Sequence, residues 1–121
     1  MKPLIALIGL ALILVVLIAI RGGRSGAVEI SMYEMRFAPN QIYADVGVPL
    51  TVRLSNVGNE RHDLAFPSLS MPHLQGLESN LGPGESRTIT LRFDEAGTYT
   101  FICAFPGHAA SGMTGAVFVR P

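Results

Sequence analysis

The sequence contains a single cysteine, Cys103, among 121 residues, so a disulfide bond within the chain is excluded. Lysine is almost absent as well: Lys2 is the only one, and residues 28–121 carry six arginines against nine acidic residues. Because there is no basic run or stripe, nucleic acid is not an expected partner. The same residues show no helical periodicity, which excludes a helical bundle.

A long apolar run is present only near the start of the chain. Residues 4–20 are 17 apolar or small residues without a charge. Roughly 17–25 residues span a bilayer as a helix, whereas the apolar region of a signal peptide is about 7–15 residues. We therefore predict a transmembrane signal-anchor over residues 1–21. The alternative is a secretory signal peptide cleaved after Ala27, with Ser25 as the second small residue of the cleavage site.

Both alternatives deliver the rest of the chain to the extracytoplasmic side of a cell membrane, periplasmic or outer. Residues 22–27 are rich in glycine and serine, which is typical of a short flexible linker. Residues 28–121 then have the length of one domain. A lone thiol in an oxidising compartment is a liability unless it is buried or bound, so Cys103 needs an explanation.

Apolar and polar residues alternate with a period of two in several segments, which predicts strands with one buried face. The longer segments are residues 27–37, 49–58 and 86–93, and the shorter ones are 41–45, 62–66, 98–103 and 115–120. Turn-forming residues separate them. About seven such strands predict an all-β, antiparallel two-sheet sandwich. We expect residues 67–85 to form a loop, with room for a helical turn at 74–79.

Four residues with metal affinity lie close to predicted strand ends. Cys103 ends one strand, and the loop over 104–114 brings His108 and Met113 after it. His62 follows the turn sequence "NVGNE", which can lie at the same end of a sandwich. Two imidazoles and a thiolate with a weak axial thioether are the ligands of a blue-copper electron-transfer site.

Other interpretations of these residues remain open at this stage. Cys103 could be a small buried hydrophobic residue or a nucleophile paired with a histidine, although Asp63 is the only nearby candidate to orient such a pair. Zinc would be expected to have more thiolates or histidines and no thioether. Met113 alone would be read as core filler. We interpret His73, close to Met71, as a solvated loop histidine rather than part of a second copper site.

The stretch "YTFICAFPGHAASGM" resembles the C-terminal copper loop of the cupredoxins, most closely that of the azurin, auracyanin and plastocyanin group. The upstream stretch "MRFAPNQIYADVGVPLTVRLSNVGNERHDL" is also similar to this family, and the resemblance covers residues 28–121. It implies an eight-stranded Greek-key β-sandwich that binds one copper ion, cycling between Cu(I) and Cu(II). The implied ligands are His62, Cys103 and His108, with Met113 in the axial position.

The resemblance also implies roles around those ligands. The backbone carbonyl of Arg61 would be a weak second axial ligand. Asp63 stands where many relatives have an asparagine, which puts the hydrogen bonds around the sulfur in question. Phe105, Pro106 and Gly107 would lie around the sulfur. Pro106 lacks an N–H, so it would remove one potential hydrogen bond near the sulfur, and Gly107 would let the backbone turn tightly before His108.

The implied function is electron transfer rather than catalysis, without a small-molecule substrate. The exposed edge of His108 would lie in an apolar patch of Phe105, Ala109, Ala110 and Met113, where a redox protein docks. The expected protein is a membrane-tethered, extracytoplasmic blue-copper carrier of single electrons between redox partners such as membrane complexes or cytochromes. The alternative is a copper-binding or copper-delivery protein, or an accessory copper subunit of a membrane oxidase.

Overall fold

The structure is a computed structural model and describes residues 26–67, 73–75 and 80–121. The predicted membrane segment over residues 1–21, with most of the linker over 22–27, lies outside these residues. Within the described part, no helix is long and apolar enough to cross a membrane.

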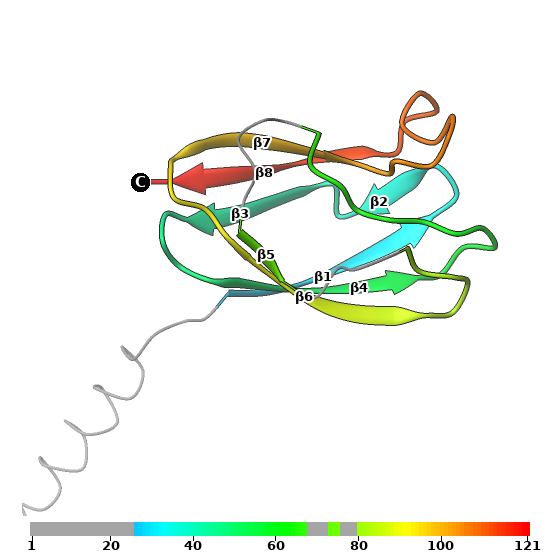
Figure 1. Cartoon of the computed structure of the whole chain (residues 1–121), viewed down its shortest axis with the longest axis horizontal. Coiled ribbons are helices and arrows are strands. Elements are labelled where there is room, and N and C mark those ends of the chain that lie inside the picture. The colour runs from blue at the N-terminus through cyan, green and yellow to red at the C-terminus, as the bar shows by residue number, and fades with distance from the viewer. Residues whose placement is uncertain (1–25, 68–72, 76–79) are drawn as a thin grey trace, which may run out of the picture.

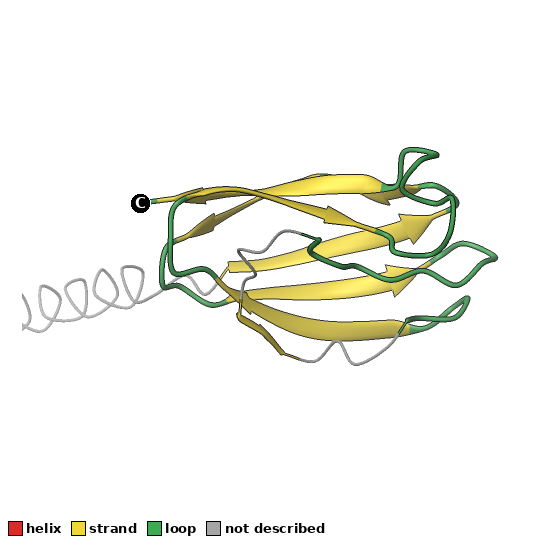
Figure 2. Cartoon of the chain, turned by 45° about the horizontal axis from the view of Figure 1, so that its top comes forward, coloured by secondary structure: helices red, strands yellow, loops and turns green. Residues whose placement is uncertain are grey.

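In the residues that the structure describes, eight strands form two sheets that pack face to face (Figures 1 and 2), which confirms the predicted all-β sandwich. The strands are β1 (Gly26–Tyr33), β2 (Arg36–Ala38), β3 (Gln41–Asp45), β4 (Leu50–Asn56), β5 (His73–Gln75), β6 (Ser86–Arg92), β7 (Gly97–Ile102) and β8 (Thr114–Arg120). The larger sheet has the order β2-β1-β4-β6-β5, and the smaller sheet has the order β3-β8-β7.

The core lies between the sheets because each strand turns its apolar alternate residues inward. In β4, Leu50, Val52 and Leu54 are buried while Arg53 between them is exposed. Phe101 of β7 is fully buried and packs edge-to-face on Phe37, with ring centroids 5.1 Å apart. This aromatic packing joins the two sheets just below the end where β7 stops.

The prediction that all strands pair antiparallel is wrong for two pairs. β1 pairs with β4 in parallel, and β3 pairs with β8 in parallel. A period of two tells which face of a strand is buried, but it carries no information on strand direction. Direction is set by where the chain crosses from one sheet to the other, and this depends on packing between distant segments.

Three predicted boundaries also differ. The strand predicted over residues 27–37 is broken at Glu34 and Met35 into the hairpin β1–β2, with Met35 at φ 65°. The segment 62–66 forms only isolated bridges, His62 to Leu81 and Ala65 to Ile102, rather than a strand. β1 begins at Gly26 because its backbone pairs with Leu50, so the end of the predicted linker belongs to the sheet.

The segment predicted as a loop over residues 67–85 contributes β5, which pairs antiparallel with β6. The helical turn considered at 74–79 is not formed at Leu74 and Gln75, which are in β5; residues 76–79 lie outside the described part.

The two ends of the sandwich differ in the segments that they carry (Figure 1). β1 and β4 run in parallel toward the end where the loop 103–113 and the segment 57–62 lie. The start of β1 and the end of β8 lie at the opposite end. The first described residue, Gly26, is thus separated from the loop 103–113 by the length of β1, about 26 Å for eight residues at ~3.3 Å each.

Candidate metal centre

The loop that carries Cys103 is closed at its base by backbone hydrogen bonds. Cys103 directly follows β7, and its N–H donates to the carbonyl of Met113 at 3.1 Å, just before β8 begins. The N–H of Met113 donates to the carbonyl of His108, also at 3.1 Å. Gly107 has φ 80°, a left-handed conformation that glycine adopts without steric cost, so the chain turns back just before His108. The loop therefore holds all three side chains in one compact turn.

His62 reaches the same place from a second segment. Its N–H donates to the carbonyl of Leu81 at 3.0 Å, and its carbonyl accepts from the N–H of Leu81 at 2.8 Å. Asn56, at the end of β4, is 1% exposed and donates from Nδ2 to the carbonyls of Leu81 and Glu60. Its Oδ1 accepts from the N–H of Gly58 at 3.0 Å. A fully hydrogen-bonded buried amide thus fixes the segment that precedes His62.

The structure brings together the three predicted ligands His62, Cys103 and His108. Their ligand atoms all lie within 4.8 Å of one another. The sulfur of Cys103 is 3.9 Å from Nδ1 of His62 and 3.4 Å from Nδ1 of His108. Two atoms bonded to one metal ion at about 2.0 and 2.3 Å are separated by at most ~4.3 Å. Both sulfur–nitrogen distances lie below this limit, so the sulfur and either imidazole can share one ion, and two imidazoles with a thiolate are a donor set that fits it.

Met113 and Arg61 flank this group. Met113 is fully buried, and its backbone is hydrogen-bonded to both Cys103 and His108. Arg61 precedes His62, and its side chain donates to Oδ1 of Asn80 at 2.6 Å. The axial roles of the Met113 sulfur and the Arg61 carbonyl stay predictions.

The surroundings of the Cys103 sulfur include Asp63, through both its backbone and its side chain. Burial raises the pKa of the Cys103 thiol, opposed by hydrogen bonds from the backbone N–H groups of Asp63 and Phe105. Oδ1 of Asp63 accepts from the N–H of Ala104 at 2.6 Å. An ionised carboxylate can only accept hydrogen bonds, and the N–H of Ala104 is a donor, so this bond can form. Asp63 therefore connects the segment that carries His62 with the loop that carries Cys103.

The alternative of a nucleophilic cysteine is weaker in the structure than in the sequence. A carboxylate that could orient a Cys–His pair is present, since Oε2 of Glu60 lies 3.1 Å from Nε2 of His108. The thiol is nevertheless fully buried, and its raised pKa is opposite to that of an activated nucleophile.

Sequence reasoning missed two carboxylates next to the histidines. Glu60 faces His108, and Oε1 of Glu34 lies 3.6 Å from Nε2 of His62. The pKa of Glu34 is lowered by hydrogen bonds from the backbone, that from Glu60 first and that from Asn59 second. The sequence signal was present only in part: Glu60 ends the turn "NVGNE", whereas Glu34 lies inside a segment that the alternation predicts as strand.

The expected apolar patch around His108 is wrong in one member. Met113 is 0% exposed, so it belongs to the interior and not to the surface. Phe105 and Ala109 are partly buried and Ala110 is exposed. His108 itself is only 9% exposed, and half-exposed Glu60 lies at its outer nitrogen. The surface near His108 therefore combines apolar groups with a carboxylate.

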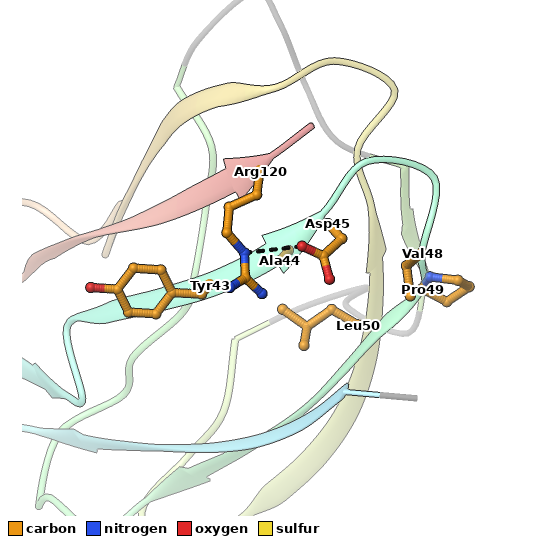
Figure 3. Close-up of a pocket in the computed structure, with 7 residues that line it drawn as sticks. All are labelled: Tyr43, Ala44, Asp45, Val48, Pro49, Leu50 and Arg120. Atoms are coloured by element: carbon orange, nitrogen blue, oxygen red, sulfur yellow. Dashed lines mark hydrogen bonds and ion pairs between the residues drawn. The ribbon is translucent and has the colours of Figure 1, made fainter. Parts of the chain in front are cut away.

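His73 lies away from the candidate centre. It is in β5 rather than in a loop, and its backbone pairs with Arg92 at the end of β6 that is distant from Ser86 and the 103–113 loop. A cavity of about 220 Å³, lined in part by Tyr43, Val48 and Arg120, also lies at that opposite end of the sandwich (Figure 3).

Comparison with known proteins agrees with this arrangement. Residues 4–114 match the cupredoxin-like domain family. Auracyanin-B of Chloroflexus aurantiacus is 31% identical over 83 residues, covering 68% of this chain and 35% of that protein. The copper-resistant cuproprotein CopI of Rubrivivax gelatinosus is 29% identical over 100 residues, covering 71% of this chain and 61% of that protein. The chain thus spans about a third of auracyanin-B and less than two thirds of CopI.

Solved structures are similar over most of the chain. Reduced auracyanin from Roseiflexus castenholzii has a TM-score of 0.66 and 25% identity, covering 82% of this chain and all of that one. A reduced amicyanin variant has a TM-score of 0.54 and 27% identity, covering 83% and 88%. The cluster of two histidines and a cysteine with a buried methionine beside it is consistent with one copper ion of the type 1 kind. This chain belongs to the cupredoxin-like family of copper proteins.

Proposed function

We propose that this chain is a blue-copper carrier of single electrons, in which His62, Cys103, His108 and Met113 would hold the copper ion. The observation that carries the proposal is that one ligand atom each of His62, Cys103 and His108 lies within 4.8 Å of the others, in a fully or nearly buried site. Copper bound by this donor set supplies a one-electron couple. The carbonyl of Arg61 would be a weak further ligand.

The surrounding residues would hold the ligands in the same positions in the oxidised and the reduced state of the centre. Asn56 and the bridge to Leu81 fix His62, while the base of the 103–113 loop fixes the other ligands. Such a site costs little rearrangement per transfer because the fold has already set its geometry. The tight loop with Pro106 and Gly107 supports the same rigidity.

We further propose that redox partner proteins dock over His108, whose ring is the ligand nearest to solvent. Phe105 and Ala110 supply apolar contact, and Glu60 supplies a negative charge beside them. β1 begins at Gly26, at the end of the sandwich opposite to this surface. If residues 1–21 anchor the chain in a membrane, the anchor would join the domain at that opposite end. The tether would then present His108 away from the membrane and raise its effective concentration for membrane-bound partners.

The test is to produce the full chain with copper in detergent and to record its visible spectrum and metal content. The proposal predicts an intense blue colour, one copper per chain and reversible bleaching on reduction. A colourless protein, or one that retains zinc instead of copper, contradicts it.

A second candidate function is copper binding or delivery, favoured by the similarity to a copper-resistant cuproprotein. Exchange separates the two candidates. A delivery protein gives its copper to a competing chelator within minutes, whereas the buried four-residue site of a carrier retains the ion through repeated reduction and reoxidation.

A further inference from the structure

Each histidine of the candidate centre has a carboxylate at the nitrogen that faces away from Cys103. Nε2 of His62 lies 3.6 Å from Glu34, and Nε2 of His108 lies 3.1 Å from Glu60. Within the described residues, Nε2 of His62 is a buried nitrogen without a hydrogen-bond partner. Because an unpaired buried polar atom is costly, the nearby carboxylate is the group that can satisfy it.

The position of Glu34 is built by three features of the fold. The hairpin turn after β1 places Glu34 at its tip, with the next residue, Met35, in a left-handed conformation that is uncommon outside glycine. The N–H groups of Asn59 and Glu60 both donate to Oε1 of Glu34. The absence of a side chain at Gly58 leaves space for the Glu34 carboxylate, since a Cβ at this position would lie 2.5 Å from Oε1 of Glu34.

The position of Glu60 is set by Asn56. The buried amide donates to the carbonyl of Glu60 at 2.8 Å and accepts from Gly58 in the same turn. One turn, residues 57–60, therefore supplies the carboxylate for His108 and the two backbone donors that seat the carboxylate for His62.

We propose that Glu34 and Glu60 are positioning residues that accept a hydrogen bond from Nε2–H of His62 and His108 and lower the reduction potential of the copper. This inference rests on the proposed function. A neutral imidazole that binds metal through Nδ1 keeps its proton on Nε2. A carboxylate on that proton fixes the ring and raises the basicity of the ligand. The added negative charge stabilises Cu(II) relative to Cu(I), which is a lower potential.

The two carboxylates differ in how salt acts on them. The side chain of Glu34 is 37% exposed and that of Glu60 is 52% exposed. Because ions screen exposed charges more than partly buried ones, the contribution of Glu60 decreases more at high salt than that of Glu34.

The first experiment measures the reduction potential of the copper-loaded full chain and its E34Q, E60Q and E95Q variants. Glu95 lies between β6 and β7 at the opposite end, so E95Q changes the net charge equally and is the matched control. We expect E34Q and E60Q each to weaken Cu(II) binding relative to Cu(I) by about tenfold, which corresponds to a rise of about 59 mV for a one-electron couple. Potentials that stay within the shift of E95Q, in variants that remain blue, overturn the inference.

Gly58→Ala provides a variant that removes no charge. Its Cβ would displace the Glu34 carboxylate, so the potential should rise in the same direction as in E34Q. Adding G58A to E34Q should then change little. If G58A raises the reduction potential as much in the E34Q background as it does alone, the turn over residues 57–60 does not act through the Glu34 carboxylate, and that part of the inference is contradicted.

A second experiment separates this inference from the proposed function. Nitrogen-detected NMR of the histidine rings in the metal-free full chain reports the Nε2–H groups directly. We expect E34Q to shift the Nε2 signal of His62 and E60Q that of His108, each leaving the other nearly unchanged. If the wild-type chain is not blue but these shifts occur, the proposed function is wrong and the contacts are right. Signals that do not respond overturn the contacts, whatever the colour.

Discussion

The two ends of the sandwich share the same strands but bury different chemistry. At the end of the 103–113 loop, the described structure buries Asn56, His62 and His108 together with Cys103. At the opposite end, the charged pair Asp45–Arg120 is exposed beside the cavity of Figure 3. Burial of polar groups costs free energy unless they are paired, so their concentration at one end indicates a site. The ligand chemistry, rather than the presence of a cavity, identifies it.

The largest expected effect at the end that carries the 103–113 loop comes from removing the thiolate. Cys103→Ser should abolish the blue colour and lower copper content to a background level, because the strong sulfur bond is lost. His73→Gln, a change in β5 away from the centre, should leave both unchanged. The measurement is the visible spectrum with metal analysis of the two variants. A blue Cys103→Ser protein would show that the centre lies elsewhere.

A smaller effect is expected from the buried amide that holds the turn over residues 57–60. Asn56→Ala leaves the carbonyls of Leu81 and Glu60 without their donor, so it should lower the free energy of unfolding by about 1–3 kcal/mol. Urea unfolding of the metal-free chain measures this. The copper affinity should fall as well, since His62 loses its support. An Asn56→Ala protein as stable as the wild type would contradict the role given to this residue.

Two buried methionines sharpen the comparison between the site and the core. Met113→Leu and Met32→Leu are similar in volume, and each should cost less than about 1.5 kcal/mol. Only Met113→Leu should change the visible spectrum and raise the reduction potential, because a thioether next to the copper is lost. Identical spectra for both variants would remove Met113 from the ligand set.

The smallest effect is expected at the end opposite to the centre. Asp45→Ala removes an ion pair whose side chains are 50% and 65% exposed, so it should cost about 0–1 kcal/mol. Copper affinity, colour and potential should not change. A change in potential comparable with that of E60Q would show that charge at any position acts equally, and the distinction between the two ends would fail.

Local patterns in the sequence were sufficient for the sandwich and for the identity of the clustered residues. Alternation predicted β4 and β6 because each has one buried face, and ligand chemistry selected His62, Cys103 and His108. Alternation did not reveal the break at Glu34, since a turn with a left-handed Met35 has no periodic signal.

Contacts between distant turns could not be predicted for the same reason. The hydrogen bonds from the turn over residues 57–60 to the Glu34 carboxylate join positions about 25 residues apart. Only the pairing of β1 with β4 brings these positions together. The interior position of Met113 likewise follows from the closed base of the loop rather than from its composition.

The central claim is tested most directly by spectroelectrochemical titration of the copper-loaded full chain. The account predicts a blue protein that bleaches and recovers reversibly in a single one-electron step, with one copper retained per chain throughout. A colourless protein, or loss of the metal on the first reduction, would contradict the claim that this fold holds a blue-copper electron carrier.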